Sequence, residues 1–182
     1  MASRIHRAAY RSPRTGGNMT RRGSRHEAPE VSSLLNPALI ALVLHRGSTT
    51  HRDENGAGLP FVYAPIVSAV SLYPAARATL TMSVATQFTT WIDRNPDIQL
   101  LLQPRIAGVV PFVREGLLFA LTTDVLRLDS GALIPGAHGP TKTIRGASSD
   151  MEAVQRTAAY MGRWLARTGN VSTVCAMLGV TP

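Results

Sequence analysis

The sequence changes character abruptly at Leu34. Residues 1–33 contain Gly16-Gly17, two prolines and several serines, but almost no large apolar side chains. Such a segment cannot bury enough surface to offset the entropy lost on ordering, so we expect a disordered basic tail over residues 1–33. Residues 34–182 are rich in apolar side chains, and we expect them to form a single folded domain.

Most of the positive charge lies in this tail. Seven arginines against two glutamates place +5 of the net charge of +8 in residues 1–30. Three interpretations stay open: a solvated or artefactual extension with Met19 as the true start, a basic arm with affinity for nucleic acid, and a transit peptide. The basic arm would consist of Arg4, Arg7, Arg11, Arg14, Arg21, Arg22 and Arg25.

The composition excludes several classes of protein. With 45% hydrophobic and 16% charged residues in a chain of 182, the sequence can form a packed core and is neither disordered throughout nor of low complexity. Cys175 is the only cysteine, which excludes a disulfide scaffold. No apolar run reaches the roughly 18 residues that cross a bilayer, so we expect a soluble, cytoplasmic protein.

Asn36-Pro37 predicts the start of a helix, because asparagine caps a helix and proline suits its first turn. Residues 38–44 are apolar on all sides, which predicts a helix buried in the domain or covered by a partner. The polar residues 46–58 are predicted to form a loop. Residues 59–72 are predicted to be helical, with Pro65 as a second start or a kink.

Apolar residues from Thr81 to Ile92 recur at intervals of three and four, which predicts an amphipathic helix. Asn95-Pro96 should end it and open the next helix, whose buried face, including Leu101, continues to Pro104. A separate, very apolar helix is predicted over residues 111–121.

Residues 125–128 and 132–135 flank Asp129-Ser130-Gly131, which predicts a hairpin with a three-residue loop. A long helix capped by Asp150 and ended by Gly169 should follow, and then a short helix over residues 172–178. The predicted fold is therefore mainly α with one small β-hairpin. Because helices precede the hairpin, we expect a winged-helix-like helical domain.

No pattern in the sequence indicates catalysis. Residues 136–143 approach the phosphate-binding loop G-x-x-x-x-G-K-[ST], but Thr141 stands where the second glycine is needed. Cys175 is predicted to be a core residue, and no nucleophile elbow occurs. We therefore expect no enzyme, no cofactor and no metal. The histidines are scattered without ligand spacing and are expected to be solvated: His6, His26, His45, His51 and His138.

Charged residues inside apolar helices are the candidates for a partner interface. Arg114-Glu115 follows Phe112-Val113 in the most apolar segment, and Arg163 precedes Trp164 on the last long helix. The interface candidates are Phe112, Arg114, Glu115, Arg163 and Trp164. The alternatives are an intramolecular ion pair or a solvent-facing edge for Arg114-Glu115, and a core Trp164 with Arg163 extending to solvent.

Several segments together resemble a known family over residues 34–182. They are Asn36-Pro37 with its apolar helix, Leu59-Pro60, Trp91 with Asn95-Pro96, residues 110–119, the hairpin around Gly131-Ala132-Leu133, residues 162–165, and residues 177–180. In order and spacing they resemble the middle component of bacterial three-component ABC-ATPase systems, to which Lamassu-type defence operons are related. The sequence departs from that pattern at Tyr73-Pro74, where the family has a histidine-containing helix end.

The resemblance implies a non-enzymatic accessory subunit that links an SMC-like ABC ATPase to a variable effector component, in an anti-phage or anti-plasmid system. DNA would be contacted through the complex or through the basic tail. The alternative is a free-standing winged-helix DNA-binding protein, which should carry a basic recognition helix. The helices before the hairpin carry only isolated Arg105 and Arg114 in apolar surroundings, which disfavours that alternative.

Overall fold

The protein was analysed as a computed structural model that describes residues 36–142 and 147–180. The predicted tail over residues 1–33, with its seven arginines, lies outside the described residues. The elements are α2 (Pro37–Asn55), β1 (Leu59–Pro60), the 3-10 helix η1 (Phe61–Tyr63), α3 (Ala64–Leu72), α4 (Pro74–Thr79), α5 (Phe88–Arg94), α6 (Pro96–Thr122), β2 (Leu126–Asp129), β3 (Ala132–Pro135), α7 (Ser149–Thr168) and α8 (Val171–Met177).

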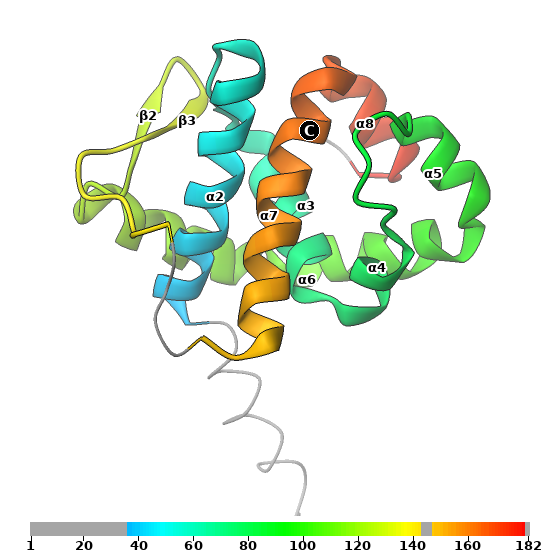
Figure 1. The fold of residues 1–182 in the computed structure, drawn as a ribbon, viewed down its shortest axis with the longest axis horizontal. Coiled ribbons are helices and arrows are strands. Elements are labelled where there is room, and N and C mark those ends of the chain that lie inside the picture. Colours follow the sequence, from blue (N-terminus) through cyan, green and yellow to red (C-terminus); the bar gives the residue numbers. More distant parts are fainter. Residues whose placement is uncertain (1–35, 143–146, 181–182) are drawn as a thin grey trace, which may run out of the picture.

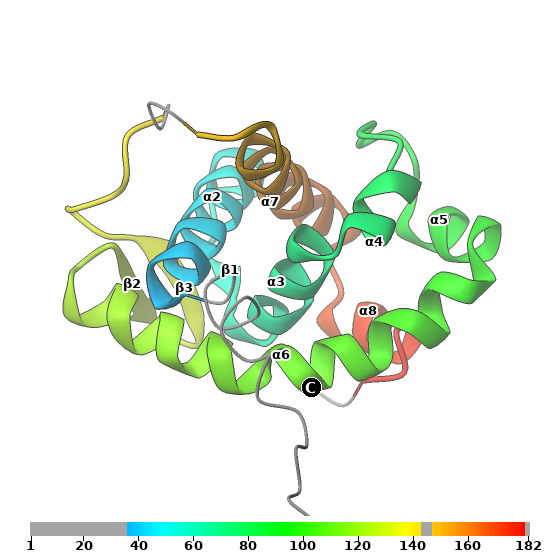
Figure 2. The ribbon, with the colours of Figure 1, turned by 90° about the horizontal axis from the view of Figure 1, so that it is seen from below.

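Helices α2 and α7 lie side by side and form the centre of the molecule (Figure 1). Helix α3 packs against both, and α6 packs against α2 and α3. Seen from below, α6 spans the molecule from the hairpin to the region of α5 and α8 (Figure 2). Together these elements bury one continuous apolar core. The mainly α fold with a small β element is thus confirmed.

Helix α2 is longer than the sequence pattern predicts. Residues 40–44 are buried within the domain, as the first of the two alternatives proposed, but the helix continues to Asn55 through the predicted loop. Its polar half is held by tertiary hydrogen bonds: the Ser48 hydroxyl donates to the Leu133 carbonyl at 2.8 Å, and the Thr50 hydroxyl donates to the Ala159 carbonyl at 2.7 Å. Packing therefore overrides the low helical preference of these residues.

Helix α6 is one helix of 27 residues, so the predicted break between Pro104 and Pro111 is wrong. A proline inside a helix deprives the carbonyl four residues earlier of its donor. Both prolines are exposed, and so are Leu100 and Ala107, which carry the two affected carbonyls. Because water can reach that side, the missing bonds cost little while the opposite face of the helix stays packed in the core.

The amphipathic helix predicted from Thr81 starts only at Phe88, and residues 81–87 form a loop. The carbonyls of this loop accept hydrogen bonds from core aromatic side chains. Trp164 Nε1 donates to the Thr86 carbonyl at 2.6 Å, and the Tyr160 hydroxyl donates to the Ser83 carbonyl at 3.1 Å. A helix in this segment would use those carbonyls internally, so long-range contacts decide its conformation.

The predicted helix ends are confirmed in part. The Asn36 side chain accepts from the Ala38 N–H at 2.8 Å, and Gly169 ends α7. Asn95 precedes α6 as expected, but its side chain donates to the Trp91 carbonyl and does not cap the helix. Ser148, not Asp150, caps α7, because its hydroxyl accepts from the backbone of the first turn.

Pro65 lies in the first turn of α3, so the second-start alternative is confirmed. The residues before it differ from the prediction: Leu59–Pro60 form a short strand and Phe61–Tyr63 a 3-10 helix. That strand, β1, joins the sheet in the antiparallel order β1-β3-β2, pairing Leu59 with Leu133.

The predicted hairpin is present as β2 and β3, but its loop has two residues. Ser130 and Gly131 both have positive φ, at 49° and 78°, as a type I′ turn requires. Asp129 extends β2 because it pairs with Ala132, which shortens the loop from the predicted three residues. The winged-helix arrangement stays a prediction.

Candidate partner-binding surface

The outward side of α6 carries a stripe of exposed and mainly apolar residues. Leu100 is 75% exposed and Leu118 is 65% exposed. They are 18 residues apart, which is five helical turns, so both point to the same side about 27 Å from each other. We call this surface the outer stripe; it consists of Leu100, Pro104, Ala107, Pro111, Arg114, Glu115 and Leu118.

Two of the predicted interface residues lie on this stripe. Arg114 and Glu115 are both exposed, and neither forms a salt bridge with another residue in the described ranges. The intramolecular ion pair considered for them is therefore not formed within the described part of the chain. Their charges are available to a partner that covers the apolar residues on either side.

Beside the outer stripe lies a groove with a volume of about 630 Å³. Phe112, the third α6 candidate, lines it. The walls come from the start of α2, the end of α3, the middle of α6 and the first turns of α7. We call it the α6 groove; its lining is Leu39, Ala69, Leu72, Tyr73, Pro74, Pro104, Arg105, Gly108, Val109, Phe112, Ser148, Asp150, Met151 and Val154.

Arg105 lines this groove, and Arg77 contacts the groove through its lining residue Asp150. The Arg77 guanidinium bonds to the Asp150 carboxylate and donates to the Ser71 carbonyl at 2.7 Å. The Arg105 guanidinium carbon lies 3.7 Å from the centroid of the Tyr73 ring, a cation–π stack, and no carboxylate in the described residues pairs with it. The groove therefore has one arginine that is positioned but not neutralised.

Trp164 lies in the core. It is 2% exposed, and its ring packs against Phe88, Trp91 and Tyr160 at centroid distances of 5.0, 5.5 and 5.2 Å. Its indole N–H is already used by the loop before α5. Its neighbour Arg163 is exposed. In this structure Trp164 is thus buried in the core, as the alternative interpretation proposed. Arg163 is exposed to solvent and remains an interface candidate.

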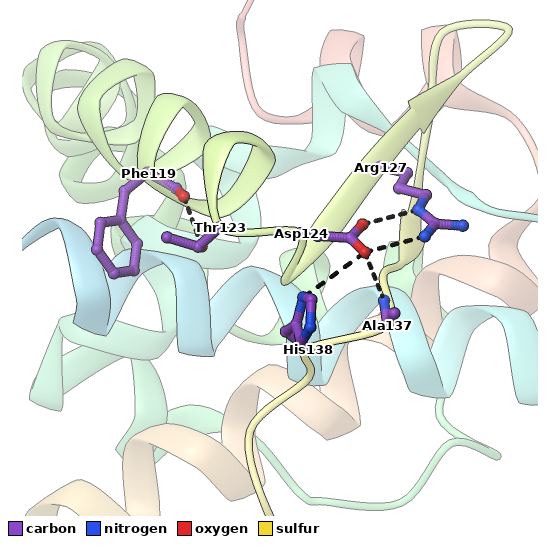
Figure 3. Close-up of polar contacts among 6 residues, drawn as sticks. All are labelled: Phe119, Thr123, Asp124, Arg127, Ala137 and His138. Atoms are coloured by element: carbon purple, nitrogen blue, oxygen red, sulfur yellow. Dashed lines mark hydrogen bonds and ion pairs between the residues drawn. The ribbon is translucent and has the colours of Figure 1, made fainter.

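Asp124 joins the end of α6 to the hairpin (Figure 3). Its carboxylate accepts from Arg127 Nε and Nη2 at 2.7 and 2.9 Å and from the Ala137 N–H at 3.3 Å. The hydrogen bond from Arg127 is the main cause that lowers the pKa of Asp124. His138 Nδ1 lies 3.7 Å from the same carboxylate. These contacts set the direction in which the hairpin leaves the helix.

Two histidines that were expected to be solvated are buried: His45 and His51 on α2 are 8% and 4% exposed. The expectation is wrong because the loop assigned to this region is helix and packs inward. Burial lowers the pKa of both side chains, and the charge of Arg46 lowers that of His45 further. His51 Nδ1 lies 3.0 Å from the Ala57 carbonyl. Burial therefore favours the neutral form of both side chains.

The other sequence features considered for chemistry are the loop that resembles a phosphate-binding loop and Cys175, and the contacts of both are structural. In the loop that resembles a phosphate-binding loop, the carbonyls of Thr141 and Lys142 accept hydrogen bonds from Arg46. Cys175 is buried, and burial raises the pKa of its thiol. Among the described residues, no group of three metal-ligating side chains lies together. No helix in the described ranges is long and apolar enough to span a membrane.

The sequence pattern singled out Phe112, Arg114 and Glu115 as candidates, and it gave no signal for Leu100, Leu118, Tyr73 or Gly108. Leu100 and Leu118 can be assigned to one side only when α6 is known to be continuous across both prolines. Tyr73 and Gly108 come together only through the packing of α3 on α6. The sequence showed Arg105 as a charge in apolar surroundings, but it did not indicate that Arg105 stacks on the Tyr73 ring.

Comparison with known proteins gives one family. The family described as ABC-three component (ABC-3C) system Middle Component 3 matches residues 24–182, so the match begins within the segment predicted as a tail. No curated protein and no solved structure matches the chain significantly. The match covers most of the chain and agrees with the resemblance inferred from residues 34–182. The chain therefore belongs to the family of middle component 3 of ABC-three component systems.

Proposed function

We propose that this middle component is a non-enzymatic accessory subunit that links an SMC-like ABC ATPase to a variable effector component, and that it does so through the outer stripe of α6. The system would act against phages or plasmids in the cytoplasm. Family membership supports the role of an accessory subunit with partner components. The specific partners and the biological purpose are part of the proposal.

The observation that carries the proposal is the exposure of Leu100 and Leu118. Exposed apolar side chains that line one side of a helix form a patch, and apolar patches on a protein surface mark sites of interaction. Here they lie on the same side of a helix that spans the molecule, with Arg114 and Glu115 between them. An apolar surface with charges that can be matched by a partner is typical of a specific protein interface.

The test is reconstitution of this chain with the ABC component of its own system. Leu100→Glu and Leu118→Glu should each weaken the complex by about 2 kcal/mol. They should leave the melting temperature unchanged, because both side chains are already exposed. Isothermal titration calorimetry measures the affinity, and differential scanning calorimetry measures stability.

Met82→Glu is the matched control, because Met82 is also an exposed apolar residue but lies in the loop before α5. If neither Leu100→Glu nor Leu118→Glu reduces the affinity for the ABC component, the proposed role of the outer stripe is contradicted. A wild-type chain that binds neither component, but binds duplex DNA tightly by itself, would favour the DNA-binding alternative.

A further inference from the structure

The α6 groove flanks the outer stripe and shares Pro104 with it. Its volume of about 630 Å³ lies in the range of real binding sites, and most of its lining is apolar. Gly108 leaves it open: a Cβ atom added there would have no neighbour within 4 Å. The packing of α2, α3, α6 and α7 thus leaves a hollow that the described residues do not fill.

Arg105 determines what can occupy this hollow. Its guanidinium group lies over the Tyr73 ring, and its N–H groups have no carboxylate partner among the described residues. An arginine held in this way is suited to bind a carboxylate through two parallel hydrogen bonds. Asp150, the carboxylate in the groove lining, is already paired with Arg77, which is not itself a lining residue. An occupant should therefore be apolar and carry one acidic group opposite Arg105.

We infer that the α6 groove binds an apolar segment, with an aspartate or glutamate placed to pair with Arg105, from one of the other two components of the system. This inference rests on the proposed function, because it assigns a second contact to the same partner interface. The charge of Arg105 selects the acidic side chain, and the groove's continuity with the outer stripe allows one partner to cover both.

The experiment measures the affinity of the full-length chain for the purified ABC component and for the purified third component. Gly108→Leu fills the groove from a position with free space, so it should not lower the melting temperature. Arg105→Glu reverses the charge of an exposed side chain and loses its stack on Tyr73, so it should lower the melting temperature by only about 2–4 °C. Each should weaken binding to one component by about 30-fold. Arg156→Glu, an exposed arginine on α7 away from the groove lining, is the matched control and should bind as wild type does.

A photoreactive benzoylphenylalanine in place of Phe112 then identifies the occupant in the assembled complex. A cross-link to an apolar segment with an acidic residue supports the inference, and a lysine at that acidic position should restore binding to Arg105→Glu. A cross-link to residues 1–35 of this chain, or to a second copy of it, would overturn the inference, as would the absence of any cross-link.

The two proposals can fail separately. If the wild-type chain binds a component and both groove variants bind it equally well, the groove inference is wrong and the accessory role stands. If the wild-type chain binds neither component, the proposed function fails and the groove inference fails with it.

Discussion

Two glycines inside helices show how differently the two sides of this molecule are built. On α7, a Cβ atom at Gly162 would lie 2.1 Å from the Gly47 carbonyl oxygen and 2.3 Å from the Thr50 hydroxyl oxygen of α2. On α6, a Cβ atom at Gly108 would meet nothing within 4 Å. The same residue type therefore marks the closest contact of the core in one place and open space in the other.

The contact at Gly162 stabilises the fold, whereas the free space at Gly108 can be filled by a partner. Glycine within a helix costs about 0.5–1 kcal/mol relative to alanine. At Gly162 the close approach of α2 and α7 offsets this cost, since the absent side chain lets the two backbones touch. At Gly108 no contact within the described chain offsets it. We interpret the first side as the folding core and the second as a binding surface.

The largest effect we expect comes from the core. Trp164→Ala should lower the free energy of unfolding by about 3–5 kcal/mol, because it removes a buried ring from the aromatic cluster. The melting temperature should fall by about 10 °C. Arg163→Ala changes the exposed neighbouring side chain and should leave it nearly unchanged. A stable Trp164→Ala variant that fails only in binding its partner would place this residue in the interface instead.

Gly162→Ala should have the next largest effect. One added methyl group meets the backbone of α2, which cannot yield as a flexible side chain could, so the two helices must move apart. We expect a loss of about 2–3 kcal/mol, measured from the midpoint of urea unfolding. An unchanged midpoint would mean that α2 and α7 are not in close contact in solution.

The smallest effect, of opposite sign, should come from Gly108→Ala. The added methyl group has free space, and alanine favours the helix, so stability should rise by about 0.5–1 kcal/mol. The same urea titration measures it and makes the comparison with Gly162→Ala direct. A clear loss of stability would show that the groove is closed in the protein in solution, and that the space beside Gly108 is not free.

Local signals in the sequence predicted the points where elements begin and end. Asn36-Pro37 and Asn95-Pro96 mark helix starts, Gly169 marks a helix end, and Ser130-Gly131 lies at a hairpin turn. Each of these depends on the conformation of a few neighbouring residues. Proline restricts the backbone, and glycine adopts positive φ readily, wherever they lie in a fold.

The candidate site was predictable from the sequence only where charged residues interrupt an apolar segment. Phe112, Arg114 and Glu115 stand out in the sequence because charge follows apolar residues. Trp164 stands out equally, yet it is buried, because interface and core tryptophans have the same sequence signal. The groove has no sequence signal, since Tyr73 and Gly108 are 35 positions apart and meet only where α3 packs on α6.

The sequence alone predicted several helix starts and ends, the mainly helical class with its hairpin, and the family of this protein. The length of α2, the continuity of α6 and the burial of His45 and His51 depend on the tertiary structure. The reason is that Ser48 and Thr50 of α2 are weak helix formers whose hydroxyls donate hydrogen bonds to carbonyls of β3 and α7. In addition, two exposed prolines can remain in α6 when its other face is buried. Contacts between residues far apart in the chain provide that stabilisation, and a local pattern does not contain them.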